Sequence, residues 1–296
     1  MSHHWGYVYA LGAALLFGVS ATLNKLVLAT VHPLIVSAII YGCAGLVLGA
    51  VRFSPLYPLV ASSLHLRHES VRLTRRDWVL IVLIAIFGAV LGPLLFLSGL
   101  QVASASSASL LLNAEVLFTA LLAMLFLRER ARPREYVALV LLFLGAVVVT
   151  TNLQFGGASM AGSLLIVAGT FCWAVDNTLS KKLSIESDVM KVAALKGLIG
   201  SAILLVLAFF LGLPLTIPPL AIPYLLFVGC LSIGASLLLF LSAMRIIGSM
   251  RTVAIFATSS LFGVLAAFFL LHETVSFVQL GAGAVMIYAV YLLANK

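Results

Sequence analysis

The chain has 296 residues, of which 63% are apolar and only 9% are charged, and it carries a formal net charge of +8. Soluble domains average about 45–50% apolar and about 25% charged residues. A water-soluble fold of this length could not bury so much apolar surface, so the composition excludes a soluble protein. The apolar runs are continuous rather than alternating, which favours membrane-spanning helices over strands.

Ten stretches are candidates for membrane spans, since a spanning helix needs roughly 20 apolar residues. In chain order they cover residues 5–27, 33–52, 77–99, 105–127, 134–152, 162–181, 188–212, 221–243, 250–271 and 275–294. The first is too long for a signal-peptide core and has no cleavage pattern after it, so we expect it to be retained. The longest polar stretch, residues 53–76, is a loop with room for a short helix. We predict an all-α polytopic membrane protein with ten transmembrane helices.

The basic residues fall on one side of this topology. With the N-terminus in the cytoplasm, Lys25 is the one cation that lies near an outer helix end, and the cations of the loops and other helix ends lie inside. The inner set comprises Arg52, Arg67, Arg72, Arg75, Arg76, Arg128, Arg130, Arg132, Arg134, Lys181, Lys182, Arg245, Arg251 and Lys296. This positive-inside bias predicts that both termini are cytoplasmic. Topology and contact with anionic lipids account for the charge, so we expect no nucleic-acid partner.

Landmarks of the first half recur in the second. At a shift of 144 residues, the run at 94–98 (LLFLS) reappears at 238–242, and the run at 127–129 (LRE) falls on the run at 271–273 (LHE). Residues 1–152 and 162–296 each contain five predicted spans. Because five is odd, the second half must be inverted in the membrane relative to the first. Inverted repeats are typical of secondary transporters, whose binding site lies between the halves near the midplane.

Two repeated motifs resemble the EamA-type members of the drug/metabolite transporter superfamily. The first opens each half and places a lysine eight residues after an aromatic–small pair, from Phe17-Gly18 to Lys25 and from Trp173-Ala174 to Lys181. The second runs from Ala114-Glu115 to Glu129, with Val116 where the family pattern usually has proline. The resemblance implies two inverted five-helix repeats in the cell membrane. It also implies transport of a small metabolite or drug, often outward.

Glu115 is the strongest candidate for a functional residue. It lies about eleven residues into its predicted span, roughly 16 Å from that helix end, and therefore near the membrane midplane. Polar groups at this depth usually face a protein interior or a water-filled cavity. A carboxyl group there can be neutral when protonated, or ionised beside a cation or water. That behaviour suits substrate binding and proton coupling, while a carboxyl that only joins helices is the alternative.

Two related stripes of side chains predict the walls of a substrate cavity. The sixth predicted span carries Trp173, Asp176 and Asn177 on one broad face, and the first span has Phe17, Ser20 and Asn24 at the matching positions. Trp173 offers a stacking or cation–π surface. Asp176 and Asn177 offer hydrogen-bond acceptors and donors. Interfacial anchoring is the alternative for the stripe of the sixth span, because that end approaches the cytoplasmic side.

Lys196 lies too deep in the seventh predicted span for snorkelling alone to satisfy it. We predict an ion pair with Asp176, favoured over Glu115 because Asp176 shares the inner half of the membrane with Lys196. Such a pair could be structural, or it could break on substrate binding and act as a gate. Tyr41 and Ser98 are secondary candidates for substrate contact.

Further polar residues have architectural explanations. Lys25 and Lys181 match across the repeat and are expected to snorkel to opposite interfaces. Glu129 and Glu273 also match, and bonding at a helix end is the expected role for each. Asn113 points away from the helical face of Glu115 and is expected to bond to a neighbouring helix.

No motif indicates an enzyme, a cofactor or a metal site. The chain has no P-loop, no HExxH and no GxSxG, and its three cysteines lie in apolar segments without a CxxC pair. We therefore expect a secondary carrier of a small-molecule substrate that works by alternating access, coupled to protons or to solute exchange. A membrane-embedded enzyme and a scaffold without transport remain as alternatives. The oligomeric state stays open.

Overall fold

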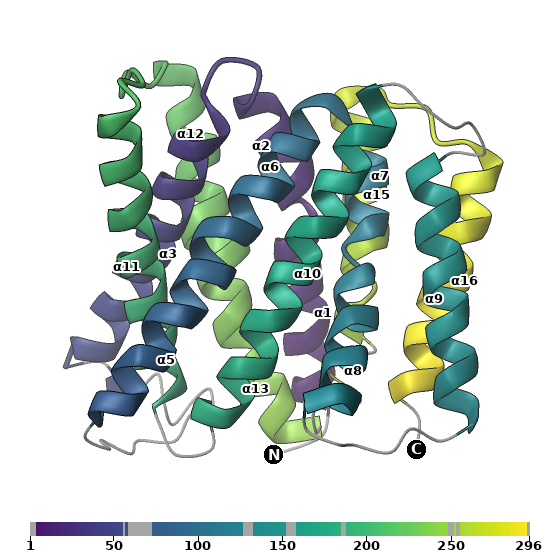
Figure 1. Cartoon of the computed structure of the whole chain (residues 1–296), viewed down its shortest axis with the longest axis horizontal. Helices are drawn as coiled ribbons and strands as arrows, with labels where there is room; N and C mark the ends of the chain where they lie inside the picture. Colours follow the sequence, from purple (N-terminus) through teal and green to yellow (C-terminus); the bar gives the residue numbers. More distant parts are fainter. Residues whose placement is uncertain are drawn as a thin grey trace.

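Helices form every regular element within the part of the chain that the computed structural model describes (Figure 1). The described residues are 4–55, 57–58, 73–126, 133–151, 158–184, 188–247, 252 and 255–294. Several predictions lie outside them, namely most of the loop 53–76, the role of Glu129, the side chain of Lys181 and many of the inner cations. The expected all-helical, polytopic membrane fold is confirmed.

The described part of the first half contributes nine helical segments, several of which follow one another along a single span of the bundle (Figure 1). In chain order these are α1 (His4–Gly18), α2 (Ser20–Val27), α3 (Pro33–Phe53), α5 (Arg75–Ala85), the π-helix η1 (Ile86–Leu91), α6 (Gly92–Val102), α7 (Ala105–Leu111), α8 (Ala114–Phe126) and α9 (Pro133–Thr151). Leucine, isoleucine, valine and alanine fill these helices, and in lipid a helix satisfies every backbone hydrogen bond internally.

The second half follows the same plan. Its elements are α10 (Ala158–Ser184), α11 (Val189–Phe210), the 3₁₀ turn η2 (Pro219–Ala221), α12 (Ile222–Leu226), the π-helix η3 (Phe227–Ala235), α13 (Ser236–Ile247), α15 (Ser259–Leu271) and α16 (Phe277–Ala294). A π-helix thus interrupts the third predicted span of the first half, and another interrupts the matching span of the second half.

In the described part of the chain, eight helical stretches are long and apolar enough to cross a membrane. They are His4–Leu28, Pro33–Phe53, Arg75–Val102, Ala105–Phe126, Pro133–Thr151, Met160–Ser180, Met190–Phe210 and Pro219–Ala243. The ninth and tenth predicted spans coincide with two shorter apolar helices, Ser259–Leu271 and Phe277–Leu292. Helix α1 begins and α16 ends at the same edge of the bundle (Figure 1). The count of ten membrane crossings and the cytoplasmic termini stay predictions.

The two halves interlock rather than forming separate units. The most extensive helix–helix interfaces join α3 to α11, α6 and α8 to α10, α9 to α16, and α1 to α13, and each of these pairs takes one helix from each half. Figure 1 shows α9 and α16 side by side at one end of the bundle. Neither half would keep its buried surface without the other.

Several spans are interrupted partway along their length. Helix α1 stops at Gly18 before α2 begins, and α7 stops at Leu111 before α8 resumes at Ala114. Around the second break, the amide N–H of Asn113 bonds the carbonyl of Leu110, a tightened i→i+3 turn. The fourth predicted span is therefore two helices, and the faces expected of one continuous helix do not hold across the break.

Glycines set the close approach of α3 and α11. A Cβ atom added to Gly45 would lie 2.8 Å from the backbone nitrogen of Leu198, and one added to Gly197 would lie 2.8 Å from the carbonyl oxygen of Tyr41. Because these neighbours are backbone atoms, they cannot rotate away. Small residues let helices approach closely in lipid, where van der Waals packing drives association.

We expect Gly197→Ala to destabilise the protein by about 1–3 kcal/mol, because the added methyl group must push α3 and α11 apart. Gly281→Ala is the matched control, since nothing lies within 4 Å of the Cβ position there. Alanine is also the better helix former, so this control should unfold at the same temperature as the native chain or higher. Thermal unfolding in detergent measures both variants. Equal melting temperatures for the two would show that the α3–α11 contact tolerates the methyl group.

Candidate functional site

A narrow cavity lies where the interrupted helices of the two halves meet. It is small in this conformation, with about 30 Å³ of interior space for water-sized molecules. Its lining residues come from α1, α2, α3, α6, α10, η3 and the α7–α8 break, and they are Phe17, Ser20, Asn24, Ile40, Tyr41, Pro93, Phe96, Leu97, Leu112, Trp173 and Ile233. Irregular backbone at membrane depth is tolerated where it is buried in protein or lines a cavity.

Five of the predicted substrate-binding residues line this cavity, namely Phe17, Ser20, Asn24, Tyr41 and Trp173. The other lining residues were not predicted as contacts. The repeated run at 94–98 contains Phe96 and Leu97, so the repeat itself carried a signal for those two. Apolar residues such as Ile40 and Leu112 have no such signal, because nothing in their local sequence distinguishes them from lipid-facing neighbours.

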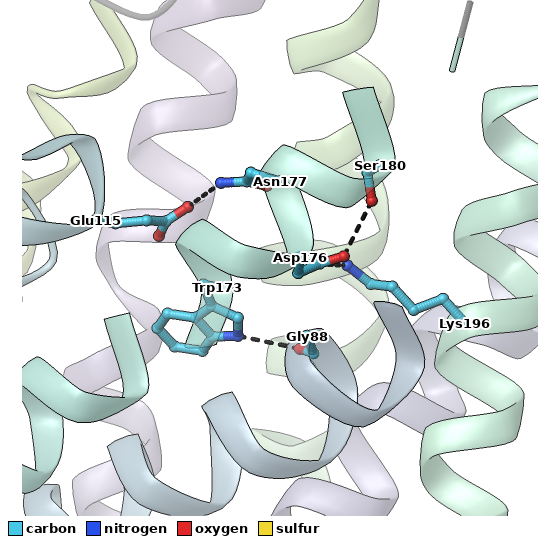
Figure 2. Close-up of polar contacts among 7 residues, drawn as sticks. All are labelled: Gly88, Glu115, Trp173, Asp176, Asn177, Ser180 and Lys196. Atoms are coloured by element: carbon cyan, nitrogen blue, oxygen red, sulfur yellow. Dashed lines mark hydrogen bonds and ion pairs between the residues drawn. The ribbon is translucent and has the colours of Figure 1, made fainter. Parts of the chain in front are cut away.

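Pro93 explains how Trp173 is held in the wall. The amide N–H of Gly92 bonds the carbonyl of Phe87, and Pro93 has no N–H, so the carbonyl of Gly88 lacks a donor from either residue. The indole Nε1 of Trp173 donates to that carbonyl at 3.0 Å (Figure 2). Pro93 thus follows a π-helix that releases one acceptor for a side chain of the other half.

Gly88 and Gly92 are required at this contact. A Cβ atom on Gly88 would overlap the carboxylate of Asp176, and one on Gly92 would lie 2.6 Å from the Trp173 indole nitrogen. The Phe96 ring packs against Trp173, with centroids 5.2 Å apart and planes tilted by 44°. The indole is therefore fixed by one hydrogen bond, one aromatic neighbour and two glycines.

Glu115 and Asn177 meet beside the cavity. The side-chain amide of Asn177 donates to Oε1 of Glu115 at 2.6 Å (Figure 2). Glu115 is half-buried and Asn177 is exposed. Each lies close to a lining residue of the cavity, since the backbone N–H of Glu115 bonds the carbonyl of Leu112 and Asn177 lies one helical turn after Trp173. Neither residue lines the cavity itself, and together they flank it.

Asp176 has a different environment, although it neighbours Asn177 in the sequence. Its carboxylate is buried with 3% of its surface exposed, it pairs with the Lys196 ammonium, and it accepts a hydrogen bond of 3.0 Å from the Ser180 hydroxyl. Figure 2 shows Glu115 and Lys196 approaching α10 from opposite sides. The predicted Asp176–Lys196 pair is confirmed, and it leaves both carboxylate oxygens of Asp176 engaged.

Ser98 and Asn24, two further candidates for substrate contact, differ in their position relative to the cavity. Ser98 is half-buried on α6 and is not among the residues that line the cavity. Asn24 lines the cavity with 4% of its surface exposed, and its side-chain oxygen has no hydrogen-bond partner among the described residues. An unpaired buried acceptor is costly and is satisfied by water or a ligand.

Asn113 joins the two halves near the same level. Its side-chain amide donates to the hydroxyl of Ser260 at 3.1 Å, and both residues are buried. This bond connects the α7–α8 break to the first turn of α15, which confirms the expected contact with a neighbouring helix.

Lys25 bonds the end of α6 instead of extending into solvent. Its ammonium donates to the carbonyl oxygens of Leu100 at 2.6 Å, Gln101 at 3.0 Å and Ala103 at 2.6 Å. Carbonyls at a helix C-terminus have no intrahelical donor and carry the negative end of the helix dipole. The expected snorkelling is thus replaced by a direct cap on the protein.

Glu273 caps the start of the next helix. Its carboxylate accepts the backbone N–H groups of Ala105 and Ser106, each at 2.9 Å, and the Ser106 hydroxyl. The expected helix-end role of Glu273 is confirmed. Lys25 belongs to the first half and Glu273 to the second, so residues from both halves hold the turn between α6 and α7. This turn lies at the edge of the bundle opposite the start of α1 (Figure 1).

Comparisons with known proteins agree with this architecture. The sequence pattern of the EamA-like transporter family matches residues 4–151 and again residues 160–295. The chain belongs to the EamA-like transporter family. It is accordingly a multi-pass protein of the cell membrane.

Individual relatives of this family member are named as transporters. An uncharacterized transporter of Methanothermobacter thermautotrophicus is 38% identical over 99% of this chain and 87% of its own length. Another from Archaeoglobus fulgidus is 24% identical over 83% and 86% of the two chains. The uncharacterized transporter YyaM of Bacillus subtilis is 23% identical over 73% and 69%. A solved crystal structure that is 18% identical has the same fold, with a TM-score of 0.67 over 99% of this chain and 97% of its own.

Within the described residues, no three His, Cys, Asp or Glu side chains gather as metal ligands would. The polar groups beside the cavity are instead the Glu115 carboxylate, which accepts a hydrogen bond from the Asn177 amide, and the separate Asp176–Lys196 ion pair. The arrangement can accept hydrogen bonds and hold one charge near the cavity.

The ion pair should show strong coupling in a double-mutant cycle. Removing one partner of a buried pair costs about 3–5 kcal/mol, because the remaining charge is left uncompensated. We expect Asp176→Asn and Lys196→Met each to lower the melting temperature in detergent. The double variant should unfold closer to the native chain than either single variant. Additive losses would instead mean that the two side chains contribute independently.

Proposed function

We propose that this membrane transporter is a secondary carrier that moves a small metabolite or drug-like solute by alternating access. The observation that carries the proposal is the cavity between the two halves, lined where their helices are interrupted. Transporters bind their substrates near the midplane at the interface of their repeats, often at discontinuous helices. The proposal includes ten membrane crossings, two inverted five-helix repeats and cytoplasmic termini.

The contacts on the two sides of the cavity indicate from which side of the membrane a substrate reaches it in this conformation. On one side, Lys25 and Glu273 hold the α6–α7 turn, and under the proposed topology that side faces outward. On the other side, Asn177 is exposed beside Glu115. We infer that the substrate reaches the site from the cytoplasm in this state, as export requires. Substrate contact would involve the lining residues together with Glu115 and Asn177.

Glu115 is the proposed coupling residue. Its carboxylate lies beside the cavity and is bonded by a neutral amide, so its proton can be gained or lost without breaking an ion pair. The Asp176–Lys196 pair has the opposite character, since each charge already has its partner. Its proposed role is to hold α10 against α11, with gating as the finer alternative if the pair opens during transport. Exchange of one solute for another would need no proton.

The competing functions find less support. A membrane-embedded enzyme needs a nucleophile, a base and an orienting group in contact, and the polar contacts beside this cavity do not include that set. A scaffold without transport predicts a closed apolar core. The unpaired oxygen of Asn24 and the carboxylate of Glu115 beside one cavity favour a binding site instead.

Transport into proteoliposomes, against a broad panel of metabolites and with or without a pH gradient, tests the proposal. We expect at least one solute to move, faster with the gradient. Glu115→Gln keeps the hydrogen-bonding shape but cannot ionise, so it should lose the stimulation by the gradient. Asp77→Asn is the matched control, because Asp77 caps the start of α5 away from the cavity and its loss should change neither rate.

Two outcomes would contradict separate parts of the proposal. Full stimulation by the gradient in Glu115→Gln would remove the coupling role of Glu115. If correctly oriented, folded protein moves no solute at all, the proposed carrier function is wrong.

A further inference from the structure

The charges around the cavity are unbalanced. No basic residue lines it, and within the described residues the one hydrogen-bond partner of Glu115 is the neutral amide of Asn177. Two described cations that adjoin residues of this site are already engaged. Lys196 is paired with Asp176, and Lys25 bonds three backbone carbonyls. Within the described residues, an ionised Glu115 therefore has no ion-pair partner of its own.

The aromatic walls of the cavity also favour an organic cation. Four of the eleven lining residues are aromatic, namely Phe17, Tyr41, Phe96 and Trp173. Aromatic faces attract cations through the ring quadrupole, and tryptophan does so most strongly. Because the indole N–H of Trp173 is bonded to Gly88 and Phe96 packs against the indole, the ring is held in place as part of the cavity wall.

The remaining lining groups distinguish between classes of solute. Asn24 contributes a buried oxygen without a partner, and such an acceptor suits an ammonium N–H. The rest of the wall is mostly aliphatic, which suits an apolar body. A zwitterion or an anion would bring a carboxylate to a site whose described lining holds no cation, so its desolvation would be uncompensated there.

We propose that the site takes a small monocationic amine that carries an apolar or aromatic group. The ammonium lies between the Glu115 carboxylate and the aromatic faces, and the apolar group fills the space between α3, α6 and η3. This inference rests on the proposed carrier function and names the class of solute that it moves. Substrate charge, more than substrate shape, then decides which solutes are accepted.

A series of solutes with one phenyl ring and different charges tests the proposal. Phenethylamine is a cation, phenylalanine a zwitterion, hydrocinnamate an anion and phenethyl alcohol neutral. Binding to the purified full chain is measured by thermal shift and by competition at mildly alkaline pH. We expect phenethylamine to bind at least about 10-fold more tightly than the other three. Counterflow in proteoliposomes should rank the four solutes in the same order.

Two variants test which residues cause the preference for the amine. Glu115→Gln should reduce the affinity for phenethylamine to about that for phenethyl alcohol, while the affinity for the alcohol stays unchanged. Trp173→Leu should lower the affinity for phenethylamine by about 10-fold. Trp78→Leu is its matched control, because Trp78 lies on α5 with 45% of its surface exposed and does not line the cavity; binding should equal that of the native chain.

The outcomes separate this inference from the carrier function. Equal or tighter binding of phenylalanine or hydrocinnamate overturns the amine preference, and so does unchanged amine affinity in Glu115→Gln. If other solutes of the broad panel are transported and phenethylamine neither binds nor moves, the carrier stands and the proposed class is wrong. If no solute of either set binds or moves in folded protein, the carrier function fails, and this inference fails with it.

Discussion

The site depends on one carbonyl group that its own helix leaves unbonded. Gly88 sits in a π-helix, and the residue that would donate to its carbonyl in that geometry is Pro93, which has no N–H. In lipid, such an acceptor must find a partner within the protein. The indole of Trp173 supplies it from the other half of the chain. This bond aligns α10 with the irregular part of the third span and brings an aromatic face to the cavity.

The same irregularity recurs around the cavity, and this determines where function can lie. Helices α1 and α2 are separated at Val19, α7 and α8 at Leu112-Asn113, and a second π-helix precedes α13. Each interruption would expose backbone polar groups if it faced lipid. Facing one another, the interruptions bond side chains such as Asn113 and Ser260, and they leave space between them. The cavity lies where the helices of the two halves are irregular.

Two neighbouring acidic residues, Asp176 and Glu115, illustrate how environment assigns a role. Asp176 is buried, paired with Lys196 and bonded to Ser180, so it stabilises the contact between α10 and α11. Glu115 is half-buried and bonded by a neutral amide. Sequence alone places both carboxyl groups within the membrane and favours Asp176 as the partner of Lys196, but it does not show the environment of either group. Their partners separate them, because a charge without a compensating charge remains available to a solute or a proton.

The amino-acid sequence by itself determined the membrane class, the helical fold, the positions of the apolar spans and the family resemblance, because continuous apolar runs and repeated motifs are local features. It also placed Phe17, Ser20, Asn24, Tyr41 and Trp173 correctly among the candidates for the cavity wall. Only the tertiary structure decided that Lys25 caps α6, that Pro93 frees a carbonyl for Trp173, and that Ile40 and Ile233 line the cavity. Those features arise from contacts between the two halves, and no local pattern records which carbonyl lacks a donor or which apolar side chain faces inward.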